Sequence, residues 1–281
     1  MKSIVIILKY AFLGALALGA LFPLFYLVVN SFIGGAEFNR YYGQLHVGLT
    51  GHNPLRLIPD WITGEGYRAV FYAQPHFLIR FWYSMLLSGS ILLGQLVVAV
   101  LGGYAFARFR FPGRSVLFFV IVLIMMMPLQ VTLVPNLMVV DALGINGSYW
   151  ALILPGMFSA FGVFLMRQVM SALPKSLFEA AKLDGANALV ALWRVCLPNC
   201  KHGLAALVVL NFADSWNMVE QPMVFLREAY QFPLAVFLVQ PHAIQPQVVF
   251  AAGLLSVLPV LMIFLWFKNE FANGIEYSNL R

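Results

Sequence analysis

Long runs of apolar residues, separated by shorter polar stretches, dominate the sequence. A helix needs about 20 mostly apolar residues to cross the hydrocarbon core of a membrane. Six runs meet or approach this length: about residues 4–29, 85–107, 116–140, 149–166, 204–226 and 248–267. The pattern predicts an all-α polytopic membrane protein, in which residues 1–281 form one transmembrane domain of six transmembrane helices.

The third run contains two prolines beside polar residues. Pro128 is followed by Gln130, and Pro135 is followed directly by Asn136. Proline removes a backbone donor and tends to kink a helix. This run therefore predicts a bent helix whose polar groups face protein or water instead of lipid.

Composition supports a lipid-facing surface. Apolar residues make up 62% of the chain and charged residues only 10%, against about 25% charged residues in soluble domains. The net charge of +6 does not indicate a nucleic-acid partner, because the basic residues are scattered in short stretches between apolar runs instead of clustering on one face.

The scattered basic residues predict the orientation of the chain. Most of them fall on the side that holds both termini, and cytoplasmic segments of membrane proteins are enriched in Lys and Arg. Both termini are therefore expected in the cytoplasm. The exceptions are Arg40, Arg56, Arg68, Arg80 and Arg227. All but Arg227 lie in a predicted outer loop at 34–80. Arg80 lies directly beside the second apolar run, where the enrichment of basic residues in cytoplasmic segments does not predict an arginine.

The polar segment between the fourth and fifth runs, residues 171–200, spans about 30 residues and is too long for a simple turn. It predicts two short helices, at about 177–184 and 188–195. Leu-Pro at 197–198 then leads into the fifth run. Helices this short are marginal in isolation and must pack on something.

The first of these helices has recognisable end signals. Ser176 and Glu179 have the spacing of a capping box, which predicts a helix beginning at Leu177. Gly185 predicts its end, because glycine readily adopts the left-handed conformation that stops many helices. Ala180 and Ala181 have small side chains, which would let another protein approach the helix closely.

The same segment resembles a known motif. Glu-Ala-Ala-x-x-Asp-Gly-Ala at 179–186, followed by Leu-Pro at 197–198, is similar to the EAA motif of binding-protein-dependent ABC importer permeases. Five further stretches resemble carbohydrate-uptake permeases of the maltose-permease G-subunit type. These stretches are residues 104–114, 128–135, 154–156, 164–168 and 215–217.

The resemblance implies a mechanism and a set of partners. The segment would form a cytoplasmic coupling helix, seated in a groove of an ATPase subunit, with Glu179 meeting a basic residue and Gly185 permitting the turn between the two short helices. The residues carried over to this role are Glu179, Ala180, Ala181, Asp184, Gly185, Ala186, Leu197 and Pro198. The implied partners are a second permease subunit in a heterodimer, an ATPase dimer and an extracytoplasmic solute-binding protein, in a bacterial-type inner membrane.

Polar residues within the runs are candidates for the solute pathway, because ionisable groups are costly inside a membrane. Asp214 and Glu220 are the acidic candidates, and the uncharged ones are Gln95, Gln130, Asn136 and Asn217. The alternative role for each is hydrogen bonding between helices.

Catalytic and metal-binding motifs are not apparent. The sequence has no G-x-x-x-x-G-K-[ST] phosphate loop, no H-E-x-x-H and no G-x-S-x-G. ATP and magnesium are therefore expected on a partner ATPase, and no cofactor or metal on this chain. Cys196 and Cys200 are expected to be small interior residues.

Three alternatives stay open at this point. The motifs concern coupling, so the solute of such a permease need not be a sugar. A self-contained secondary transporter would be expected to show a repeated set of spans. An intramembrane enzyme would need a catalytic pair within the spans.

Overall fold

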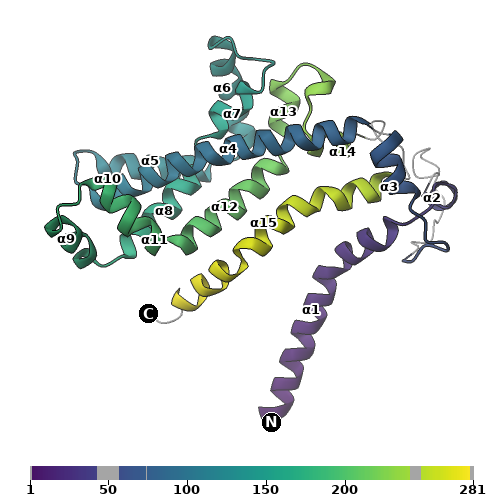
Figure 1. Cartoon of the computed structure of the whole chain (residues 1–281), viewed down its shortest axis with the longest axis horizontal. Coiled ribbons are helices and arrows are strands. Elements are labelled where there is room, and N and C mark those ends of the chain that lie inside the picture. Colours follow the sequence, from purple (N-terminus) through teal and green to yellow (C-terminus); the bar gives the residue numbers. More distant parts are fainter. Residues whose placement is uncertain (1, 43–56, 74, 241–247, 279–281) are drawn as a thin grey trace. The chain divides into compact units, whose positions relative to one another are not determined.

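Every regular element that the computed structural model describes is helical (Figure 1), which agrees with the all-α prediction. The described residues are 2–42, 57–73, 75–240 and 248–278. They form two compact units: Met1–Phe81 with Phe237–Leu258, and Trp82–Val236 with Pro259–Arg281. Helices α4 and α15 contribute residues to both units.

Four stretches are long and apolar enough to cross a membrane individually. They are Ile6–Asn30 in α1 (Lys2–Asn30), His76–Arg108 in α4 (Pro75–Arg108), Trp150–Ala172 over α7 (Trp150–Gly156) and α8 (Ala160–Ala172), and Val249–Glu270 in α15 (Val249–Ser278). Two sharply bent pairs also qualify: α5 (Arg114–Met126) with α6 (Leu129–Ala142), and residues 188–199 with α12 (Lys201–Trp216). The described part of the chain thus holds four candidate spans, or up to six if each pair counts once.

The third apolar run bends as predicted, and the bend is large. The axes of α5 and α6 differ by 109°. Met127 takes an extended conformation, with ψ of 129°, because the residue before a proline is disfavoured in the helical region. Pro128 then becomes the N-cap of α6, whereas Pro135 is accommodated inside that helix.

The fifth apolar run, predicted at 204–226, is divided between two helices. Helix α12 ends at Trp216, and α13 (Glu220–Phe225) begins after a short break. In a continuous helix the ring of Pro222 would clash with the carbonyl of Met218. The predicted run at 204–226 extends across this proline, although proline tends to interrupt a helix.

Three other helices extend well beyond their predicted runs. Helix α8 continues to Ala172, past residue 166, and α15 continues to Ser278, past residue 267. Helix α4 begins at Pro75, well before residue 85. Arg80 therefore lies inside a helix, with its guanidinium carbon 4.5 Å from the centroid of the Phe237 ring. A cation over an aromatic face is stabilising, which accounts for a basic residue at this exceptional position.

In the unit formed by Met1–Phe81 with Phe237–Leu258, much of the predicted outer loop at 34–80 is helical. It contains α2 (Gly35–Tyr42), α3 (Glu65–Arg68) and a π-helical turn, η2 (Ala69–Ala73). The Ser31 and Tyr67 hydroxyls lie 2.7 Å apart, and Glu65 accepts a hydrogen bond from the backbone of Gly35. Residues 43–56, including Arg56, lie outside the described part of the chain.

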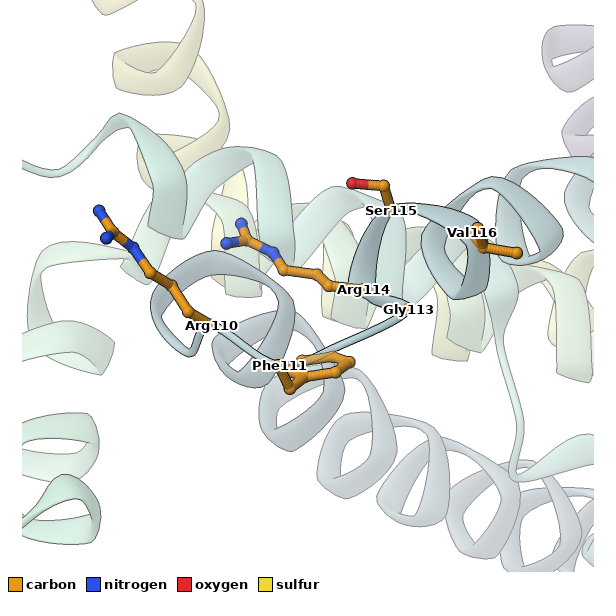
Figure 2. A pocket seen from close by; sticks show the side chains of 6 residues that line it. All are labelled: Arg110, Phe111, Gly113, Arg114, Ser115 and Val116. Carbon is orange, nitrogen blue, oxygen red and sulfur yellow. The ribbon is translucent and has the colours of Figure 1, made fainter.

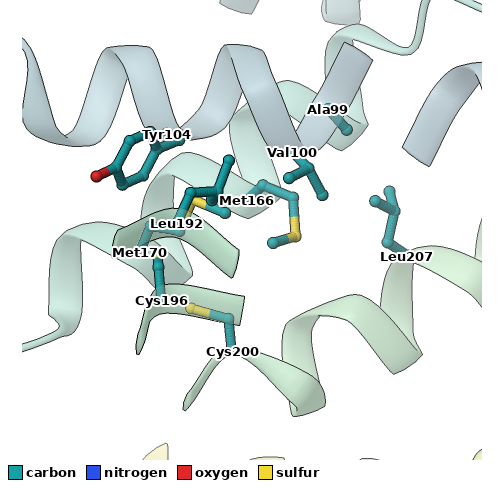
Figure 3. Close-up of a cluster of buried hydrophobic side chains, with 9 residues drawn as sticks. All are labelled: Ala99, Val100, Tyr104, Met166, Met170, Leu192, Cys196, Cys200 and Leu207. Atoms are coloured by element: carbon teal, nitrogen blue, oxygen red, sulfur yellow. The ribbon is translucent and has the colours of Figure 1, made fainter. Parts of the chain in front are cut away.

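In the unit formed by Trp82–Val236 with Pro259–Arg281, a buried apolar cluster joins α4, α8, α12 and a π-helical turn, η3 (Leu192–Cys196) (Figure 3). Its members are Ala99, Val100, Tyr104, Met166, Met170, Leu192, Cys196, Cys200 and Leu207. Both cysteines are fully buried, as predicted. Small residues bring α4 and α8 close: a Cβ added at Gly103 would lie 2.6 Å from the Cβ of Met166.

Candidate functional site

The segment 171–200 forms two short helical stretches, where α4 and α8 end (Figure 1). Helix α9 (Lys175–Leu183) begins earlier than predicted, and the expected capping box between Ser176 and Glu179 is not formed. Pro174 is the N-cap instead, with φ of −57° and ψ of 140°. Since the helix starts directly after this proline, Ser176 lies inside the first turn and its hydroxyl cannot cap it.

The end of α9 is as predicted. Gly185 has a φ of +79°, in the left-handed region that glycine occupies without strain. Its N–H donates to the carbonyl of Lys182 at 3.1 Å, and the N–H of Ala186 donates to that of Ala181 at 2.9 Å. These two bonds form a Schellman motif, which fixes the direction in which the chain leaves α9.

The second helical stretch is longer than predicted. It comprises α10 (Ala188–Ala191), η3 and α11 (Leu197–Asn199). Its N-cap is Asn187, whose side-chain oxygen accepts a hydrogen bond from Val190 at 2.9 Å. Asparagine is a favoured N-cap residue, so this signal was available in the sequence. Leu197 and Pro198 belong to this stretch, and the turn into α12 follows at Cys200.

The predicted coupling residues differ in exposure. Glu179, Ala180, Asp184, Gly185 and Pro198 are exposed, whereas Ala186 and Leu197 are partly buried. Ala181 is buried, so the prediction that it offers a surface to another protein is wrong: its side chain packs inward. Sequence reasoning missed the exposed large apolar side chains of this segment: Leu183 is 90% exposed, Trp193 64% and Leu189 61%.

A second candidate region is a cavity of about 780 Å³ between α4, α6, α7, α12 and α13. Five of the predicted pathway residues line it: Gln95, Asn136, Asp214, Asn217 and Glu220. Gln130 is not in its wall, but its side-chain nitrogen donates to the Glu220 carboxylate at 3.1 and 3.2 Å. This bond joins two predicted pathway residues that are 90 positions apart in the sequence.

Gln95, a buried side chain, also belongs to the wall of this cavity. The side chain is only 8% exposed, and its Nε2 donates to the carbonyl of Gly156 at 2.8 Å. That bond identifies the amide nitrogen, because a carbonyl only accepts. The Oε1 atom has no hydrogen-bond partner among the described residues. Buried polar atoms normally have one, so this enclosed oxygen is an exception.

The charged residues described in the cavity wall are all acidic. Asp214 and Glu220 supply two carboxylates, and the described residues of the wall include no Lys, Arg or His. Both acidic residues are exposed. Because an acidic side chain facing lipid is costly, this face is suited to water, a solute or another protein subunit.

A smaller cavity of about 360 Å³ lies at the start of α5 and is basic (Figure 2). Arg110 and Arg114 extend to the same side of the helix end (Figure 2). Arg114 donates to the carbonyl of Phe109 at 3.2 Å. These arginines are among the residues whose positive charge predicts a cytoplasmic connection between α4 and α5.

Several apolar helices, a helical polar segment and a polar cavity are features of a membrane transport subunit. The chain belongs to the family of binding-protein-dependent transport system inner membrane components, whose profile matches residues 95–276. It is a multi-pass inner-membrane protein and the permease subunit of a binding-protein-dependent ABC importer, not its catalytic component. This assignment confirms the resemblance seen in the sequence. It excludes two of the alternatives raised by the sequence, a self-contained secondary transporter and an intramembrane enzyme.

Individual relatives cover nearly the whole chain. The arabinooligosaccharides transport system permease protein AraQ of Bacillus subtilis (strain 168) is 28% identical over 96% of this chain and 94% of its own length. The sn-glycerol-3-phosphate transport system permease protein UgpE of Yersinia pestis bv. Antiqua (strain Antiqua) is 34% identical over 80% of this chain and 84% of its own length.

Solved structures show the same fold. A chain in the crystal structure of a bacterial ABC transporter involved in the import of the acidic polysaccharide alginate has a TM-score of 0.78 and 26% identity, covering 96% of this chain and 97% of that one. A chain of an alginate ABC transporter in complex with an alginate pentasaccharide-bound periplasmic protein has a TM-score of 0.62 at 16% identity, covering 92% of each chain.

Proposed function

We propose that this chain and a second, different permease subunit together form the pathway for a carbohydrate delivered by an extracytoplasmic binding protein. Segment 171–200 faces the cytoplasm and docks on an ATPase dimer that holds ATP and magnesium, and both termini are cytoplasmic. The predicted coupling residues with exposed side chains belong to the docking surface: Glu179, Ala180, Asp184 and Pro198.

The exposed apolar side chains of segment 171–200 carry the docking proposal. Leu183, Leu189 and Trp193 are all more than half exposed. The charge bias of the chain predicts that this segment lies in the cytoplasm, where lipid does not cover these side chains. Large apolar side chains left exposed within one short segment favour a protein contact, and the exposed carboxylates of Glu179 and Asp184 suit a partner with basic groups.

The cavity supports a proposal about the solute. The exposed carboxylates of Asp214 and Glu220 line the cavity and accept hydrogen bonds. A solute with many hydroxyl groups supplies the matching donors. The two carboxylates repel an anionic solute, since like charges repel each other at short distance. We therefore propose an uncharged carbohydrate, the chemistry named for AraQ, over a phosphorylated or acidic one.

Transport assays test the solute proposal. The transporter is purified with its co-purifying partners, reconstituted in vesicles, and supplied with a neutral oligosaccharide, glycerol 3-phosphate or an acidic oligosaccharide. We expect ATP-dependent uptake of the neutral sugar, and weaker uptake after the double substitution Asp214→Asn and Glu220→Gln. Asp141→Asn, at an exposed acid outside the cavity wall, is the matched control.

Two outcomes contradict this reading of the cavity. Preferred uptake of glycerol 3-phosphate or of the acidic oligosaccharide would refute the charge argument. Unchanged uptake in the double variant, together with weakened association of the two permease subunits, would assign Asp214 and Glu220 to pairing between subunits instead.

A further inference from the structure

Arg108, the last residue of α4, joins three helices at the base of the segment 171–200. Its Nη2 donates to the carbonyl of Met170 at 2.6 Å and to that of Leu173 at 3.0 Å. Both acceptors lie at the end of α8. The guanidinium carbon of Arg108 also lies 3.7 Å from the centroid of the Phe178 ring in α9.

The Met170 carbonyl needs an outside donor because of the sequence that follows it. In a continuing helix this carbonyl would accept from the N–H four residues later. That residue is Pro174, which has no N–H. Arg108 supplies the missing donor, and its positive charge also suits the C-terminal end of a helix. The proline that starts α9 thus creates the acceptor that Arg108 fills.

Phe178 is held on the same face of α4 by a second residue. Tyr104 lies one helical turn before Arg108, and its ring centroid is 6.4 Å from that of Phe178. Phe178 and Leu173 both pack against the buried cluster that joins α4, α8, η3 and α12. Helix α9 is therefore attached to the ends of α4 and α8 through one aromatic side chain and one arginine.

We infer that Arg108 is a positioning residue that makes α9 move together with α4 and α8 as one body. The inference rests on the proposed docking of segment 171–200 on an ATPase. If α9 tilts alone, the cation–π contact with Phe178 is lost while the hydrogen bonds to α8 hold Arg108 in place. A displacement imposed on α9 is thereby passed to the ends of α4 and α8. The helices of the solute cavity follow, since α4 also supplies Gln95 to its wall.

The first test measures solute transported per ATP hydrolysed in the reconstituted transporter. We expect Arg108→Gln to lower this ratio by about fivefold or more, the range typical of a lost coupling between sites. Arg110→Gln is the matched control, since Arg110 is exposed and no hydrogen bond joins it to a described residue. Phe178→Leu should behave like Arg108→Gln. Phe178→Tyr, which keeps the ring, should restore the ratio.

The second test measures the position of α9 directly. Spin labels on Ser171→Cys, next to the end of α8, and Lys182→Cys, in α9, use two exposed positions. The two native cysteines are fully buried. We expect a narrow distribution of label distances in the wild type and in Arg110→Gln, and a broad one in Arg108→Gln and Phe178→Leu.

The outcomes separate this inference from the proposed function. If Arg108→Gln matches Arg110→Gln in both measurements, Arg108 does not position α9. If Glu179→Lys and Gly185→Val leave transport intact, the docking role of the segment fails, whatever Arg108 does. If Arg108→Gln does not fold, Phe178→Leu decides, because it leaves both hydrogen bonds of Arg108 in place, and a wild-type result for it overturns the inference.

Discussion

At the scale of single residues, Gly185 is a position where backbone conformation alone decides which side chain is allowed. A Cβ there would meet no atom within 4 Å, but φ is +79°. The constraint is therefore conformational and not steric. A non-glycine residue in this region costs about 1–2 kcal/mol, and Asn tolerates it better than most residues.

We predict that Gly185→Val uncouples ATP hydrolysis from transport while membrane insertion remains normal. The β-branched side chain disfavours the left-handed turn, so α9 and α10 lose their fixed angle. Solute uptake and ATP hydrolysis in vesicles measure the effect, and the amount of protein in the membrane fraction reports insertion. Gly185→Asn should keep most of the uptake; an equal loss in both variants would contradict the conformational explanation.

Glu179 gives a second prediction at this scale. The expected capping box is not formed, and Glu179 has no hydrogen bond or ion pair with the described residues. Its substitution should therefore cost little stability. We predict that Glu179→Lys abolishes uptake without changing the thermal stability of the purified chain, because it reverses a charge offered to the ATPase. A drop in the unfolding temperature matching the loss of uptake would show that Glu179 serves the fold.

At the scale of helices, the packing of α4 on α8 depends on a close approach at Gly103. A Cβ at this position would lie 2.6 Å from Met166 Cβ and 2.9 Å from the backbone nitrogen of Arg167. Backbone cannot move aside as a flexible side chain can. The two helices would have to separate along the cluster that also holds Phe178.

We predict that Gly103→Val destabilises the folded chain by roughly 1–3 kcal/mol, the usual cost of overpacking a core. Gly89→Val is the matched control, because Gly89 lies in the same helix and a Cβ there meets nothing within 4 Å. Thermal unfolding in detergent distinguishes the two. Equal unfolding temperatures would mean that α4 and α8 are not packed as closely as described.

Helix positions were largely predictable from the sequence, whereas helix ends were not. Hydropathy located the apolar runs because it depends only on composition over about 20 residues. The ends depend on single residues: Pro174 moved the start of α9, and Pro222 divided the fifth run. The cavity was partly predictable, since Asp214 and Glu220 are costly in a membrane wherever they lie. The contacts of Arg108 were not predictable, because its two hydrogen-bond acceptors lie 62 and 65 residues away in the chain.

At the scale of the whole molecule, the chain has the features of a solute pathway but not those of an ATPase. It carries no phosphate-binding loop. We predict that the purified chain alone hydrolyses no ATP, and that hydrolysis appears when the co-purifying ATPase is added. Turnover that persists after a further purification step would contradict the division of labour between subunits.

The exposed apolar side chains Leu183, Leu189 and Trp193 also have a consequence for the cell that makes this protein. Until an ATPase covers them, they resemble the surface of a misfolded protein, which chaperones and proteases recognise. A chain made in excess of its partner should therefore be degraded faster than an assembled one. The same three residues that allow assembly would then also keep the subunits in balanced supply.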